Sequence, residues 1–205
     1  MSRPTFAAFD FDGTMTRSDT LVPFLASVAG RSNVARALAS QSATLAYAAT
    51  GRGDRDVAKE RVLTRVLAGL PYADVETAGR SFGAELARTE ITAHARERIA
   101  WHRREGHEVV IVSASLDVYL REVADQLGVV HLLCTSLDVD SHGTCTGRLL
   151  GANCRGAEKA TRLTGLIGTG AVELWAYGNS SGDDEMLALA DHPIRARRGR
   201  IRSNR

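Results

Sequence analysis

The stretch Thr5-Phe-Ala-Ala-Phe-Asp10-Phe-Asp12-Gly13-Thr14 decides the fold of this 205-residue chain. Its first half is apolar and indicates a buried strand, which ends where charge and glycine replace the apolar run. Because alternate strand residues point to opposite sides, the two aspartates can approach one space from different directions. Ligands of open α/β sheets bind beyond the carboxyl ends of the strands, so we expect Asp10 and Asp12 at a binding site. An isolated pair of this kind can equally be two solvated turn acids.

Short apolar runs recur along the chain and are separated by sequence of helix length. The runs cover residues 108–112, 129–133, 171–176 and 193–196. The segments 91–105, 116–127, 159–166 and 185–190 have the pattern of helices. Strands this apolar, alternating with helices, predict an α/β fold with a Rossmann-like parallel sheet covered on both faces. Residues 138–149, with turn residues in the middle, predict a hairpin instead.

The segment from residue 18 to residue 88 breaks this alternation. It contains several helical patterns and no convincing strand, and one apolar stripe runs from Val57 to Leu70. Gly51-Arg-Gly53-Asp54 precedes that stripe and Pro71 closes it. We therefore expect an all-helical cap, residues 18–88, inserted after the first strand. The core would comprise residues 1–17 and 89–205, and its last part, 195–205, would be a basic tail.

Composition limits the remaining classes. The chain is 44% hydrophobic, and no run approaches the roughly 20 apolar residues that span a bilayer. The N-terminus lacks the pattern of a secretion signal, and the three cysteines form no CxxC pair, so we expect a cytoplasmic protein with reduced thiols. Six arginines fall in the last eleven residues. The chain uses arginine for nearly every other cation as well, which makes Lys59 and Lys159 conspicuous.

Three further segments carry polar groups at corresponding places. Ser113 lies at the end of the second strand, Lys159 opens a helix in Gly156-Ala-Glu-Lys159, and Gly178-Asn-Ser-Ser-Gly-Asp-Asp184 follows the fourth strand. With the first stretch, these segments resemble the four motifs of the haloacid dehalogenase superfamily of phosphohydrolases. The sequence is most similar to its phosphoserine-phosphatase-like branch, which carries a helical cap between the first two motifs. The resemblance covers the chain except its tail.

The resemblance implies a phosphomonoester hydrolase acting through an aspartyl phosphate. Asp10 would be the nucleophile, and Asp12 the general acid and base. Ser113 and Lys159 would bind phosphoryl oxygens. Mg²⁺ would be the cofactor, held by Asp10, the Asp12 carbonyl and one or both of the side chains Asn179 and Asp183. The motif more often begins with aspartate at the position of Asn179, so this metal site would be one charge less negative.

Two rival motifs are weaker. Gly178-Asn-Ser-Ser-Gly182 matches the GxSxG of α/β-hydrolases, but only 23 residues follow it, too few to supply the acid and histidine from later strands. Residues 151–156 have the glycine spacing of a P-loop, but the lysine comes late and no serine or threonine follows it.

The cap should decide the substrate, which we expect to be a small phosphorylated metabolite. Asp19 occupies the place of an acid that meets the ammonium of phosphoserine in the similar enzymes, although it also suits a helix N-cap. The matching carboxylate-binding arginine is missing, because its position is Leu63, flanked by Arg61 and Arg65. Phosphoserine is therefore doubtful.

Two alternatives stay open. One is a lipid-phosphate phosphatase of the phosphatidylglycerophosphatase type, because the cap is rich in Ala and Leu. The other is a non-catalytic binding protein whose arginine tail contacts nucleic acid or a membrane. We expect neither nucleic acid nor membrane as the main partner, and the number of subunits is left open.

Overall fold

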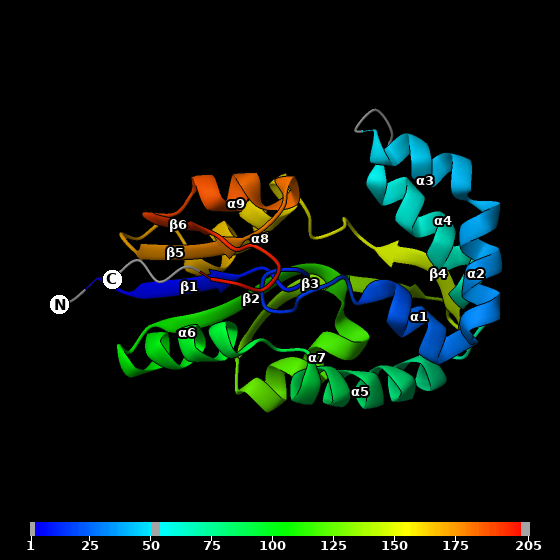
Figure 1. Ribbon diagram of the computed structural model, residues 1–205, viewed down its shortest axis with the longest axis horizontal. Helices are drawn as coiled ribbons and strands as arrows, with labels where there is room; N and C mark the ends of the chain where they lie inside the picture. Colours follow the sequence, from blue (N-terminus) through cyan, green and yellow to red (C-terminus); the bar gives the residue numbers. More distant parts are fainter. Residues whose placement is uncertain (1–2, 51–53, 202–205) are drawn as a thin grey trace.

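The computed structural model describes residues 3–50 and 54–201, and its centre is a six-stranded sheet (Figure 1). The strands are β1 (Thr5–Phe9), β2 (Glu108–Leu116), β3 (His131–Val139), β4 (Cys145–Leu150), β5 (Glu173–Gly178) and β6 (His192–Arg195). Their order is β4-β3-β2-β1-β5-β6, and every neighbouring pair is parallel except β3 with β4. The predicted parallel α/β sheet is confirmed.

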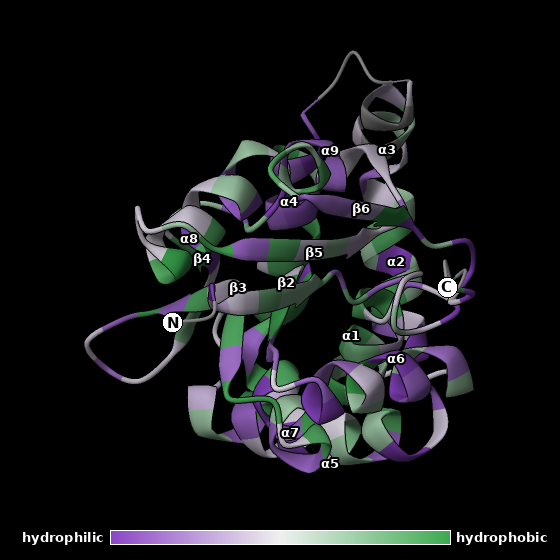
Figure 2. Ribbon diagram, turned by 90° about the vertical axis from the view of Figure 1, so that its left-hand side faces the viewer, coloured by the Kyte–Doolittle hydropathy of each residue, from purple (hydrophilic) through white to green (hydrophobic). Residues whose placement is uncertain are grey.

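The two faces of the sheet bury alternate residues of the same strand. Ala7 and Phe9 belong to one hydrophobic cluster, whereas Phe6 and Ala8 belong to the other. The first face is covered by α6 (Ala93–Arg104) and α7 (Asp117–Leu127), with α5 (Tyr72–Thr89) packed on α7, and the second face by α8 (Ala157–Ile167) and α9 (Asp184–Ala188), as Figure 2 shows. Strands buried on both faces need apolar residues throughout, which explains the continuous runs in the sequence.

Five consecutive helices occupy the region between β1 and α6. They are α1 (Leu21–Ala29), α2 (Arg31–Ser40), α3 (Ser42–Ala49), α4 (Arg55–Leu67) and α5. The side chain of Asp54 caps α4 by accepting hydrogen bonds from two backbone N–H groups, while residues 51–53, part of the expected opening of this helix, lie outside the described residues. The helical insertion after the first strand is therefore present, and α1 to α4 project beyond the sheet (Figure 1).

The last helix of the insertion, α5, does not remain in the projecting group. It lies along α7, and Gly79 and Gly83 permit this approach, because a Cβ atom at either position would come within 2.4 Å of a backbone oxygen of Val118 or Tyr119. The expected boundary at residue 88 thus falls at the end of a helix that packs on the core helix α7.

The predicted hairpin is real, but its first strand is also the third strand of the sheet. Residues 131–139 form one continuous strand where the sequence pattern suggested two, and β4 then turns back toward α4. Thr64 of α4 donates a hydrogen bond to the carbonyl of Gly147, and Gly69 donates to Cys145. The hairpin therefore supports the projecting helices.

The arginine-rich C-terminal segment is folded up to its last described residue. Ala196 and Ile201 are buried, and the N–H of Gly199 donates to the carbonyl of Gly13 in the loop after β1. Thr92 donates to the carbonyl of Gly199. The expected basic tail, residues 195–205, is therefore folded against the core up to residue 201 with its described arginines exposed, and 202–205 lie outside the described part. Among the described helices, none is both long and apolar enough to cross a bilayer.

Candidate active site

Side chains from four distant segments meet at one end of the sheet. Strand β1 lies between β2 and β5, and all three are parallel, so their carboxyl ends coincide. A cavity of about 370 Å³ at this end is lined by the groups that the sequence predicted for it: Asp10, Asp12, Asp19, Ser113, Lys159, Asn179 and Asp183. The expected convergence at the end of the first strand is what the structure shows.

Lys159 is the centre of this cluster. Its ammonium lies 2.6 Å from Oδ1 of Asp10 and 2.6 Å from Oδ1 of Asp183, and all three residues are buried. Burial disfavours the charged ammonium, but the two carboxylates outweigh it and raise the pKa of Lys159. Burial, together with the neighbouring charge of Asp183, raises the pKa of Asp10 against the opposing effect of Lys159. Lys159 is thus a permanent cation held against the end of β1.

Both carboxylate oxygens of Asp183 are engaged. Oδ1 accepts from Lys159, while Oδ2 accepts from the backbone N–H groups of Asn179 and Ser180 and from the Ser180 hydroxyl. Burial raises the pKa of Asp183, but the opposing effect of Lys159 and these hydrogen bonds is larger, so the pKa lies below its usual value. Asp184, the next residue, is exposed and pairs with Arg195. The two adjacent acids therefore have different environments.

Asn179 lies on the other side of this loop, close to Gly13. Gly13 has a φ of 77° and approaches so closely that a Cβ atom there would be 2.0 Å from Nδ2 of Asn179. A residue with a side chain would be strained in this conformation and would also displace the amide. The glycine after the second aspartate is thus required by the position of Asn179.

Asp12 has an environment unlike that of Asp10. Its Oδ1 accepts hydrogen bonds from the N–H and the hydroxyl of Thr20, and its Oδ2 accepts from the Ser115 hydroxyl. Burial, followed by the charge of Asp19, raises the pKa of Asp12 to about 7 despite these bonds. A carboxyl group with this pKa can give and take a proton near neutral pH. Asp19 itself is exposed and accepts from the N–H of Leu21, as an N-terminal helix residue does.

A larger cavity of about 670 Å³ lies between the helical cap and this cluster. It shares Asp12, Asp19, Ala114 and Arg155 with the smaller cavity, so the two are continuous. Neither Arg61 nor Arg65 lines it, although both were candidates for specificity. Arg61 is exposed and donates to Thr44 of α3, and Arg65 faces a separate hollow beside α2. The helix turns both side chains away from the cluster.

Lys59 occupies the place where those arginines were expected. Its ammonium donates to the carbonyl of Ala114, 2.5 Å away, and to Oδ1 of Asn153, 2.8 Å away. Asn153 also donates to Asp56 of the same cap helix. Burial lowers the pKa of Lys59 to about 8. The rarity of lysine in this arginine-rich sequence was a signal for Lys59, because Lys59 lines the larger of the two connected cavities and Lys159 the smaller.

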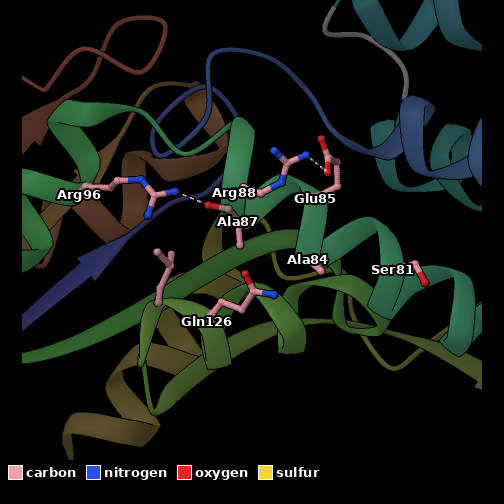
Figure 3. A pocket seen from close by; sticks show the side chains of 8 residues that line it. Ser81, Ala84, Glu85, Ala87, Arg88, Arg96 and Gln126 are labelled. Carbon is pink, nitrogen blue, oxygen red and sulfur yellow. Dashed lines mark hydrogen bonds and ion pairs between the residues drawn. The ribbon is translucent and has the colours of Figure 1, made fainter.

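Another hollow lies between α5, α6 and α7, away from the aspartates (Figure 3). Its charged residues are engaged within the protein. Arg88 pairs with Glu85 at 2.5 Å, and Arg96 donates to the carbonyl of Ala87. This hollow therefore offers no arrangement comparable to that around Lys159.

The sequence and the fold both have known relatives. The chain is 35% identical over 188 residues to the protein CicA of Caulobacter vibrioides, covering 92% of this chain and 84% of that protein. It is 30% identical over 196 residues to a probable phosphatase of Mycobacterium tuberculosis, covering 92% and 67%. A substrate-bound phosphoserine phosphatase has a similar fold, with a TM-score of 0.69, 21% identity, and 95% and 86% of the two chains covered. The model of the haloacid dehalogenase-like hydrolase family matches residues 7–188, and the chain therefore belongs to that family.

Proposed function

We propose that this hydrolase is a Mg²⁺-dependent phosphatase that hydrolyses a phosphomonoester through an aspartyl phosphate on Asp10. The family membership and the phosphatase among its relatives support the class of reaction. The observation that carries the proposal is the contact of Lys159 with Asp10 at 2.6 Å inside a cavity that Ser113 also lines. A carboxylate can attack a phosphate dianion only where cations and hydrogen-bond donors offset the repulsion between them.

The two aspartates have separate roles in this proposal. An oxygen of Asp10 attacks phosphorus, and the bond to the leaving oxygen breaks as Asp12 donates its proton to that oxygen. Asp12, now ionised, takes a proton from the water that hydrolyses the aspartyl phosphate. Its pKa of about 7 suits both steps. The Ser113 hydroxyl and the Lys159 ammonium hold the phosphoryl oxygens during both transfers.

The residues around Asp10 fit a magnesium ion. Within the described ranges no three His, Cys, Asp or Glu side chains form a metal-binding group, so an all-acid site is not available. Magnesium is usually held in proteins by one or two carboxylates and several waters. Asp10, the carbonyl of Asp12 and the amide oxygen of Asn179 supply oxygen ligands of this kind. The ion would offset the charge of the phosphoryl oxygens.

The hydrogen bonds of Asp183 favour one of the two ligand choices that the sequence left open. Among the described residues, Oδ2 of Asp183 accepts from three donors of its own loop, whereas Oδ2 of Asp10 accepts from the Thr14 hydroxyl alone. Asp183 therefore serves to hold Lys159 in place and to fix the loop that carries Asn179. We therefore assign the direct contact with the metal to Asn179. The cavity that would hold the phosphate is also lined by Arg17 and Arg155, so with a neutral amide as ligand the positive charges there are those of Lys159, the two arginines and the ion.

The test is release of inorganic phosphate from an aryl phosphate with and without Mg²⁺. We expect turnover to require the ion and Asp10→Asn to abolish it. Asp184→Asn is the matched control, because this aspartate is close in sequence to the site but exposed and paired with Arg195. Turnover at the wild-type rate in Asp10→Asn would overturn the assignment of the nucleophile.

A further inference from the structure

The cavity under the cap has an apolar wall that the chemistry at Asp10 does not use. Leu21, Val22 and Leu25 of α1 form one side of it, and Leu38 of α2 and Val62 of α4 continue it. Its volume of about 670 Å³ lies within the range of roughly 300–1,000 Å³ that is usual for pockets of small ligands. The phosphoryl group needs only the smaller cavity beyond Asp12.

Some of the polar residues of the same cavity, Asp56, Lys59 and Asn153, are bonded to one another. Lys59 donates to Ala114 and Asn153, and Asn153 is bonded to Asp56 and to Thr135 of β3. These bonds join the cap helix α4 to the core. Two of the three ammonium protons of Lys59 are thereby already donated, so among the described residues the charged groups of the lining that remain available to a ligand are Asp19, Arg55 and Arg155, which are not part of the apolar wall.

The apolar wall continues outward past the rim of the cavity. Val22 is 41% exposed, whereas Leu25, three residues further along α1, is fully buried. A neighbouring hollow of about 530 Å³ between α1 and α2 shares Val22 and Leu38 with the cavity. An apolar surface therefore runs from Asp12, where the leaving oxygen would lie, to the outside of the cap.

From this continuity we infer that the substrate is a phosphomonoester with a bulky apolar leaving group, which lies along Leu21, Val22 and Leu38. The inference rests on the proposed phosphatase function and names the class of substrate for the same site. A zwitterionic leaving group such as serine would lose its hydration where it lies against this wall.

The test is a series of straight-chain alkyl phosphates, namely ethyl, butyl and hexyl phosphate, with phosphoserine for comparison. The leaving alcohols of the series have nearly equal reactivity, so differences in kcat/KM report contacts of the chain. Each methylene buried against the wall should raise kcat/KM by about 4-fold, the equivalent of full transfer from water. Phosphoserine should fall below butyl phosphate.

The variant Val22→Asp places a charge in the path of the chain. Val57→Asp is the matched control, because Val57 is 42% exposed, also lies in the first turn of a cap helix, and is not part of the cavity wall. Both substitutions put an acid near a helix N-terminus, where it is tolerated. We expect Val22→Asp to remove most of the dependence on chain length, and Val57→Asp to keep it and to hydrolyse ethyl phosphate like the wild type.

The outcomes separate the two proposals. If the wild type hydrolyses an aryl phosphate with Mg²⁺ but its kcat/KM does not rise from ethyl to hexyl phosphate, the inference of an apolar leaving group is overturned while the proposed phosphatase function stands. Equal losses in Val22→Asp and Val57→Asp would also overturn it. If no phosphomonoester is hydrolysed at all, the proposed function itself fails.

Discussion

Gly13 offers a test of how the site depends on the close approach of two loops. Replacing it by alanine keeps the charge and every proposed ligand, but adds one carbon atom. That atom would lie 2.0 Å from Nδ2 of Asn179 in a backbone with a φ of 77°. The substitution therefore acts on the site through geometry alone.

The contacts of Gly13 set the size of the expected effect. Ordinary van der Waals contact begins near 3.4 Å, so the Asn179 amide must retreat from 2.0 Å by about 1.4 Å. Misplacement of a positioned group by about 1 Å can cost roughly 10²-fold in rate, and we expect a loss of at least this size in kcat. The left-handed backbone adds about 1–2 kcal/mol of strain to the folded state.

Gly143→Ala is the matched control for the strain. Gly143 has a φ of 76° and lies in the turn between β3 and β4, where an added Cβ atom would meet nothing within 4 Å. Urea unfolding should show a similar loss of stability in both variants, whereas phosphate release and Mg²⁺ titration should be impaired in Gly13→Ala alone. Full activity and unchanged Mg²⁺ dependence in Gly13→Ala would refute the placement of Asn179 at the metal.

Three further predictions concern single side chains. Asp12→Asn should slow hydrolysis of an alkyl phosphate by roughly 10²–10⁴, the usual effect of a general acid or base, and an unchanged kcat would contradict that role. Asp183→Asn should lower kcat/KM by more than about 10-fold because Lys159 loses a charged partner; a loss of stability without a loss of activity would show that the pair is only structural. His102 is buried, and burial lowers its pKa from 6.5 to about 3, so the unfolded chain takes up the proton first as the pH falls. As the pH falls from about 7.5 to about 5.5, this difference in pKa should lower the free energy of unfolding by about 1.4 kcal/mol, and urea unfolding of His102→Gln should lack this decrease. An equal dependence of the unfolding free energy on pH in the two proteins would contradict the prediction.

Much of the candidate site was predictable because its signals are local. Asp10 and Asp12 follow an apolar run, and parallel strands place their carboxyl ends at one edge, so the convergence with Ser113 and Asn179 followed from pattern and general topology. Lys159 was marked by its rarity and its place in the first turn of a helix. The alternation of apolar strand patterns with helix patterns was sufficient to predict the parallel sheet.

The cap was the part that sequence could describe only as helical. Which face of α4 meets the core depends on how the helix rotates against β4 and α2. That rotation places Lys59 in the cavity and turns Arg61 and Arg65 away from it. The path of residues 196–201 was equally unpredictable, because it depends on contacts with Gly13 and Thr92, far away in the chain.

The sequence by itself determined the α/β sheet, the inserted helices and the identity of the acids and the lysine at the end of β1. The tertiary structure alone decided which oxygens those groups share, that Asp183 is committed to Lys159, and that an apolar wall continues beyond Asp12. The physical reason is the range of the forces involved. Hydrophobic periodicity and turn chemistry act over a few neighbouring residues, whereas hydrogen bonds and cavities depend on the packing of segments as far apart as Asp10 and Lys159.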